Sequence, residues 1–140
     1  MISYKTYIKN LIDKDHYIYK ITGPEDYLDL ETGEWFCKSY IGSTINISTK
    51  LDNLVQEMKE GKTMANGRPR PIVSAIKKFG VKNFELEVLE VVTGFEKARK
   101  REKYYIKKYN TLARYKRGYN ISEGGDIPFE PEREKNWDAV

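Results

Sequence analysis

One carboxylate in this sequence occupies an unusual position for a charged group. Apolar residues between Phe95 and Tyr109 recur with the 3.6-residue period of an amphipathic helix, and Glu102 falls near the middle of their face at 100° per residue. An ionised carboxylate on such a face is costly unless another charge compensates it. Two alternatives fit: a Mg²⁺ ion, which commonly takes one carboxylate plus waters and a phosphate, or a salt bridge to a neighbouring Lys or Arg.

Tyrosines from two predicted strands could reach the same place. Tyr17 and Tyr19 point the same way in the first strand, and Tyr40 ends the second strand, where Gly42 permits a tight turn into a helix. Buried tyrosine hydroxyls are expected to find polar partners. We expect the tyrosines to converge with Glu102 on one edge of the sheet, although a tyrosine-rich sheet face can also serve packing alone.

The charge distribution favours a polyanionic partner. The chain has a net charge of +4, yet residues 94–117 hold ten Lys and Arg against two acids, whereas residues 123–140 hold six acids against two bases. A local basic surplus suits nucleic acid, and a solvated helix face is the alternative interpretation. The acidic segment is interpreted as a solvated tail.

Size and composition predict one domain inside the cell. The chain has 140 residues, 39% of them hydrophobic, which is enough for a single core. No run of eighteen apolar residues appears, and residues 1–11 lack the hydrophobic centre of a signal peptide, so we expect no membrane span and no export. The single Cys37 fits a reducing cytoplasm.

The order of predicted elements describes an α/β fold, with a small three-stranded, mainly antiparallel sheet flanked by helices. We divide the chain into an amino-terminal helical extension (1–14), a catalytic-type domain (15–125) and an acidic carboxy-terminal tail (126–140). Within the domain the expected elements are a strand (16–22), an exposed acidic loop (23–34), a strand (35–41), a helix (47–61) capped by residues 43–46, a loop (62–70), a short helix (72–79), a strand (83–92), a helix (95–109) and glycine turns (118–125).

Several short motifs along this order resemble a known family. YIY at 17–19 is followed by YIG at 40–42, FG at 79–80, NFELEVLE at 83–90, RKREKYYIKKYN at 99–110 and GYN at 118–120. This set is similar to the GIY-YIG nucleases, with Tyr17 standing where the family's first glycine usually is. The resemblance covers roughly residues 16–125, and it depends on both tripeptides in order with the helix, glutamate and asparagine that follow.

The resemblance implies a role for each matching residue. Tyr19 would be the general base or would position the attacking water, and Tyr40 would orient the water or the phosphate. Glu102 would bind a single divalent ion, Mg²⁺ or Mn²⁺, and Asn120 would lie near the active site. The implied activity is metal-dependent hydrolysis of DNA phosphodiester bonds by an endonuclease of the homing or phage type.

The sequence departs from the family pattern on the first helix of the domain. The family usually carries an arginine eight residues after the YIG glycine and a His or Tyr four residues later, and this chain has Lys50 and Leu54 there. Lysine keeps the charge but lacks the planar fork of arginine. Arg68 or Arg70 from the following loop could substitute for it. We expect the DNA-contacting residues to be Lys50, Arg68, Arg70, Arg99, Arg101 and Lys103.

Three functions remain open on the sequence. The first is the metal-dependent endonuclease, and the second is a nucleic-acid-binding protein that keeps the fold but has lost activity through Lys50 and Leu54. The third is a structural partner protein that uses its charge only for solubility. Target choice would come from the loops, the amino-terminal helix, a homodimer or an accessory specificity protein, because no residue code for base readout is visible.

Overall fold

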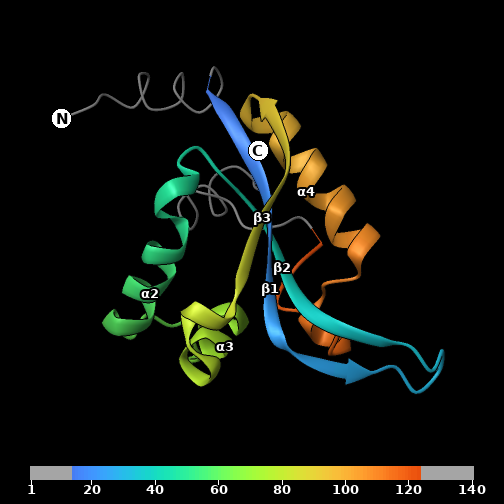
Figure 1. The fold of residues 1–140 in the computed structure, drawn as a ribbon. Coiled ribbons are helices and arrows are strands. Elements are labelled where there is room, and N and C mark those ends of the chain that lie inside the picture. Colours follow the sequence, from blue (N-terminus) through green and yellow to red (C-terminus); the bar gives the residue numbers. More distant parts are fainter. Residues whose placement is uncertain (1–13, 124–140) are drawn as a thin grey trace.

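Three antiparallel strands form the centre of the structure, a computed structural model that describes residues 14–123. β1 (Asp15–Leu28) lies in the middle and pairs antiparallel with β2 (Trp35–Thr44) on one side and β3 (Glu85–Thr93) on the other (Figure 1). The predicted α/β fold with a small antiparallel sheet is therefore confirmed. The predicted helix at 1–14, apart from Lys14, and the acidic tail at 126–140 lie outside the described residues.

Helices cover both faces of the sheet. α2 (Lys50–Glu60) and α3 (Pro71–Phe79) lie on one face, and α4 (Phe95–Tyr109) lies on the other (Figure 1). Each face has its own apolar core: Ile21, Leu54, Ile72 and Ile76 pack with Tyr19 and Tyr40 beneath α2 and α3, whereas Ile18, Ile41, Ala98 and Ile106 pack beneath α4. Short 3-10 turns complete the chain: η1 (Ile47–Thr49), η2 (Val81–Asn83) and η3 (Ala113–Tyr115).

The first half of the acidic segment predicted as a loop at 23–34 is strand. β1 continues through Gly23 and Pro24 to Leu28, and the pairing with β2 shifts register between Thr22 and Asp26. A proline that cannot donate to the ladder is tolerated at such an irregularity. Only residues 29–34 form the turn. The outer part of this hairpin is held to the domain by Arg117, which contacts Asp29 at 2.7 Å and lies 3.9 Å from the Phe36 ring centroid.

The turn predicted at Gly42 is also absent, because β2 continues through this glycine to Thr44. Gly42 stands directly opposite Tyr19 in the ladder. A Cβ at position 42 would overlap the Tyr19 hydroxyl and lie 2.6 Å from its Cζ atom, so the tyrosine ring fills the space that a side chain would need. The glycine is required by this close approach and not by a change of chain direction.

The remaining predictions concern boundaries. α4 has the predicted limits, α3 begins one residue early with Pro71 in its first turn, and β3 begins at Glu85 after η2. The helix predicted from residue 47 begins as η1 and becomes α2 at Lys50, and no side chain at 43–46 caps either element. Among residues 14–123, no helix combines the length and apolarity that crossing a bilayer would require.

Candidate active site

Tyr19 and Tyr40 lie side by side in the core between the sheet and the α2–α3 pair. Register places Tyr19 opposite Gly42 and Tyr40 opposite Ile21, so both rings project from the same face of the sheet. Their centroids are 6.2 Å apart at 41°, and both side chains are almost fully buried. The absence of a side chain at Gly42 leaves room for the Tyr19 hydroxyl and Cζ atoms directly over that residue of β2.

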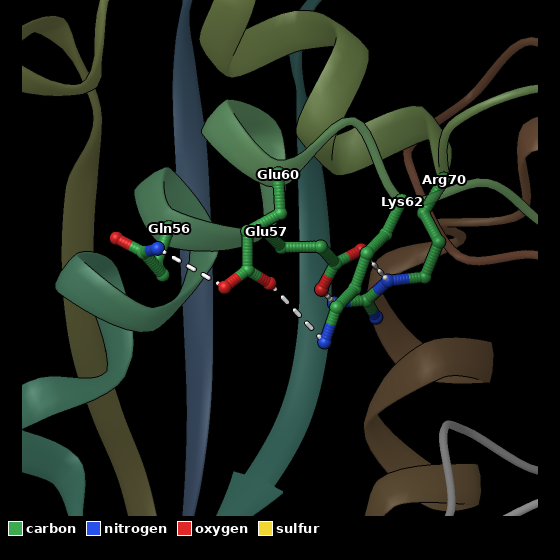
Figure 2. A network of polar contacts seen from close by, with 5 residues as sticks. All are labelled: Gln56, Glu57, Glu60, Lys62 and Arg70. Carbon is green, nitrogen blue, oxygen red and sulfur yellow. Dashed lines mark hydrogen bonds and ion pairs between the residues drawn. The ribbon is translucent and has the colours of Figure 1, made fainter.

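Tyr40 is held by a charged pair from the neighbouring helices. Arg70, the residue before α3, donates from Nη1 to the Tyr40 hydroxyl at 3.1 Å. Its Nε and Nη2 atoms donate to the two carboxylate oxygens of Glu57 on α2, each at 2.9 Å. Figure 2 shows this pair beside the Gln56–Glu60–Lys62 contacts at the end of α2. Such two-pronged pairing fixes the plane of the guanidinium.

Glu57 is a functional candidate that the sequence interpretation missed. It lies seven residues after Lys50 and three after Leu54, so all three share the inner face of α2. Leu54 is buried in the core with the two tyrosines, which makes it a packing residue in this fold. The same helical spacing that identified Glu102 on α4 could have identified Glu57 on α2.

Glu102 reaches the site from the opposite face of the sheet. It is 1% exposed on the inner face of α4, as predicted, and both carboxylate oxygens are buried without a hydrogen-bond partner among residues 14–123. The hydroxyl and amide of Ser43, near the end of the edge strand β2, lie close enough to favour the ionised form without reaching hydrogen-bond geometry. The carboxylate therefore has no hydrogen-bond partner in the described part of the chain, since hydrogen bonds weaken steeply outside that geometry.

Burial raises the pKa of Glu102 to about 8. Ser43 and the positive charges of Lys50 and Arg99 act in the opposite direction but do not outweigh desolvation. The salt bridge considered as an alternative from the sequence is not formed, because no ion pair joins Glu102 to a base within residues 14–123. A buried carboxyl whose pKa is displaced in this way marks a functional-site candidate.

Lys50 connects the two halves of the site. Its ammonium lies 5.8 Å from the Tyr19 ring centroid, and it senses the charges of both Glu57 and Glu102. Burial and the nearby Arg70 lower the pKa of Lys50, while the two glutamates raise it. The tyrosines and Glu102, which were predicted to converge at one edge of the sheet, lie on its opposite faces, and Lys50 is near Tyr19 and close enough to sense the charge of Glu102.

Asn120 lies beside the site with its side chain fully engaged in the backbone. Its Oδ1 atom accepts from the Ile41 amide at 2.8 Å and from the Thr111 hydroxyl at 2.7 Å, and its Nδ2 atom donates to the Ile41 carbonyl at 2.8 Å. The amide group therefore ties the 112–120 segment to β2 between Tyr40 and Gly42. In this arrangement both polar atoms of the Asn120 side chain form hydrogen bonds within the domain.

The predicted DNA-contacting residues fall into separate places. Lys50 and Arg70 lie in the site, Arg68 is exposed in the 61–70 loop, and Arg99 on α4 is close enough to influence Glu102. The Nε atom of Arg99 is buried without a hydrogen-bond partner in the described part of the chain. Arg101 is paired with Glu90 of β3 at 2.8 Å, and Lys103 lies on the outer side of α4.

The residues present fit one divalent cation. No group of three or more His, Cys, Asp or Glu side chains within residues 14–123 could enclose a metal ion. Mg²⁺ does not need such a cage, because it commonly binds through one or two carboxylates, waters and substrate phosphate. The two unpaired oxygens of Glu102 are the buried polar atoms that such an ion would satisfy.

Two solved structures share this fold. The catalytic domain of the homing endonuclease I-TevI is 21% identical with a TM-score of 0.52, and the match covers 76% of this chain and 98% of that one. A mutant form of the catalytic domain of the intron endonuclease I-TevI is 19% identical with a TM-score of 0.53, and it covers 78% and 95% respectively. No curated protein matches the chain significantly.

These likenesses establish the fold: the sheet order and its flanking helices are those of the I-TevI catalytic domain. The model of that family, described as the GIY-YIG catalytic domain, matches residues 15–120. The chain therefore belongs to the GIY-YIG family of nuclease domains.

Proposed function

We propose that this domain is a DNA endonuclease that hydrolyses phosphodiester bonds with one divalent ion held by Glu102. The observation that carries the proposal is the pair of unpaired, buried carboxylate oxygens beside Lys50, Arg99 and the end of β2. Mg²⁺ or Mn²⁺ at Glu102 would neutralise phosphate charge and assist the activation of water. Membership of the nuclease family supports DNA as the substrate.

The chain's own residues would position the reactants. Tyr19 would accept a proton from the attacking water or hold that water in line, and Tyr40 would orient the water or a phosphate oxygen. The Tyr40 hydroxyl accepts a hydrogen bond from Arg70, so its own hydrogen points away from the guanidinium. Lys50 and Arg99 would stabilise the negative charge that develops on the phosphate.

A direct test is cleavage of plasmid DNA with Mg²⁺ or Mn²⁺. Glu102→Gln should abolish cleavage, because the amide keeps the shape of the side chain but cannot bind the cation. Glu96→Gln is the matched control, since Glu96 is an exposed carboxylate in the first turn of the same helix. Equal cleavage by the wild type and Glu102→Gln would reject the proposed site.

A second candidate is a DNA-binding protein with little or no hydrolytic activity. It is favoured by Lys50 in place of the usual arginine and by the commitment of Arg70 to Glu57 and Tyr40. Lys50→Arg separates the candidates, because the planar guanidinium should increase cleavage by an otherwise intact site. DNA binding without cleavage by the wild type and by Lys50→Arg, with either metal ion, would support this second candidate.

A further inference from the structure

A groove runs along the outer side of α4, away from the two tyrosines of the site. It has a volume of about 540 Å³ and lies between α4 and the segment that follows it. Three lysines, two tyrosines and one carboxylate of its lining carry the argument: Lys100, Lys103, Lys107, Tyr104, Tyr115 and Glu123. We call this feature the α4 groove.

The lysines give the α4 groove a positive charge. Lys100, Lys103 and Lys107 follow the i, i+3, i+7 spacing that places side chains along one stripe of a helix. None of the three forms an ion pair with a carboxylate within residues 14–123. The carboxylate of Glu123 is neutralised by Arg114 at 3.1 Å. A groove with this charge is complementary to phosphate groups.

The two tyrosines of the α4 groove are both exposed, and each has an arginine beside its ring. Tyr104 is 47% exposed and Tyr115 is 61% exposed, although both are large aromatic side chains. An arginine lies against each ring: the Cζ atom of Arg101 is 4.3 Å from the Tyr104 centroid, and that of Arg114 is 5.1 Å from the Tyr115 centroid. Each arginine is in turn held by a carboxylate, Arg101 by Glu90 and Arg114 by Glu123.

This arrangement prepares the rings for stacking. A cation beside a ring restricts the orientation of that ring, and both exposed rings also line the groove. Around α4, Arg101 lies on one flank of Tyr104, whereas the lysine stripe lies on the other flank. Exposed aromatic rings beside unpaired lysines are the combination with which proteins bind single-stranded nucleic acid, because bases stack on the rings while cations follow the phosphates.

A path also connects the α4 groove to the candidate active site. Arg99, Lys103 and Lys107 are four residues apart, so each lies about 40° further around α4 than the one before. Arg99 influences Glu102, and Lys103 and Lys107 line the groove. The series therefore leads from the carboxylate to the groove with one cation per turn of helix.

We propose that the α4 groove binds unpaired nucleotides of a DNA strand that continues from the scissile phosphate. The lysines would contact its phosphates, and Tyr104 and Tyr115 would stack on its bases. In a duplex the base faces are covered by their neighbours, so a preference for an unpaired arm follows from the tyrosines. This inference rests on the proposed function for the identity of the ligand, and it specifies the form of the substrate as a branched or frayed duplex.

Binding without cleavage is the appropriate measurement. Fluorescence anisotropy in EDTA would compare the full chain on a blunt duplex and on a duplex of equal phosphate number that ends in an unpaired arm. We expect the arm-bearing DNA to bind roughly tenfold more tightly or better.

The double variant Tyr104→Leu/Tyr115→Leu should lose this preference and keep the salt dependence, whereas Lys103→Gln/Lys107→Gln should reduce the salt dependence. Trp35→Leu is the control, since Trp35 is an exposed aromatic outside the groove.

The outcomes separate this inference from the proposed function. Equal binding of both DNAs, or an arm preference that survives in the tyrosine double variant, would overturn it even if the protein cleaves plasmid. Arm preference lost only in the tyrosine variant would support it even if the protein cleaves nothing. If binding rises without arm preference when Glu132 and Glu134 are changed to Gln, the groove is assigned to the chain's own acidic segment and the proposal fails.

Discussion

Arg70 Nη1 donates a hydrogen bond to the Tyr40 hydroxyl at 3.1 Å while its other nitrogens are held by Glu57. The orientation of Tyr40 on β2 therefore depends on the carboxylate of Glu57 on α2, which acts through Arg70. Arg68 and Arg70 are the two loop residues that could substitute for the missing arginine at position 50, and Arg68 is exposed. In the structure Arg70 lies in the same site as Lys50 and contributes a second positive charge to it.

Glu57→Gln should lower cleavage by roughly 10–100-fold, because the amide cannot hold both guanidinium nitrogens and Tyr40 loses its fixed donor. DNA binding without metal should not weaken, since a negative charge is removed. Glu60→Gln is the matched control: Glu60 lies on the same helix and contacts Gln56 and Lys62 at the surface. Equal cleavage rates for the two variants would contradict a positioning role for Glu57.

Gly42→Ala should destabilise the domain by about 1–3 kcal/mol, because the new methyl group would overlap the Tyr19 ring. The cost should fall substantially in a Tyr19→Leu background, in which the ring is gone. Urea unfolding of the wild type, both single variants and the double variant gives this coupling directly. If the losses of stability in the two single variants simply add in the double variant, the Tyr19 ring is not the reason why position 42 requires glycine.

Asn120→Ala should cost about 2–4 kcal/mol of unfolding free energy, since it removes three buried hydrogen bonds to Ile41 and Thr111. Hydrogen exchange of the Ile41 amide should accelerate at the same time. Asn83→Ala is the comparison, because the Asn83 side chain makes one exposed bond to the Phe79 carbonyl. An unchanged Ile41 exchange rate would show that Asn120 does not restrain β2.

Glu102 should make stability depend on pH when no divalent ion is present. Its pKa in the folded state is about 8 against an ordinary 4.5, so the folded chain keeps a proton that the unfolded chain loses between these values. Unfolding then releases a proton, and stability falls as pH rises from about 4.5 to 8 and changes no further above that range.

Glu102→Gln removes this dependence on pH. At pH 8 the free energy of unfolding of the variant should therefore exceed that of the wild type by a few kcal/mol, since each pKa unit corresponds to about 1.4 kcal/mol. Thermal unfolding from pH 5 to 8.5 measures the difference, with Glu96→Gln as control. Mg²⁺ should reduce the difference in stability between the two proteins, because it stabilises the wild type alone. Parallel curves for the wild type and Glu102→Gln would show that the carboxyl has an ordinary pKa.

The sequence was most informative where the periodic spacing of apolar residues extends over several turns of a helix. The limits of α4 and the burial of Glu102 were predictable because fifteen residues repeat one face. The path of β1 was not, because Gly23 and Pro24 have the composition of a turn, and only pairing with β2 keeps them in the sheet. The role of Gly42 was misjudged for the same reason, since it depends on the residue opposite it.

Within the site, the motifs located the two tyrosines, Lys50 and Glu102, whereas their arrangement on opposite faces of β2 depends on tertiary packing. The bonds between Asn120 and Ile41 could not be derived from any local pattern, because they join positions 79 residues apart. Helical spacing alone could have placed Glu57 on the inner face of α2, but its pairing with Arg70 and the α4 groove become visible only when the neighbouring elements are placed.

The bonds from Asn120 to Ile41 also have a consequence for synthesis. A nascent chain leaves the ribosome amino end first. Both tyrosines, Lys50 and Glu102 therefore emerge before Asn120, whose side chain bonds to Ile41 of β2. The bonds of Asn120 therefore form late in synthesis, and a truncated product that lacks Asn120 would contain Tyr19, Tyr40, Lys50 and Glu102 without the contacts that hold the edge strand β2 in register.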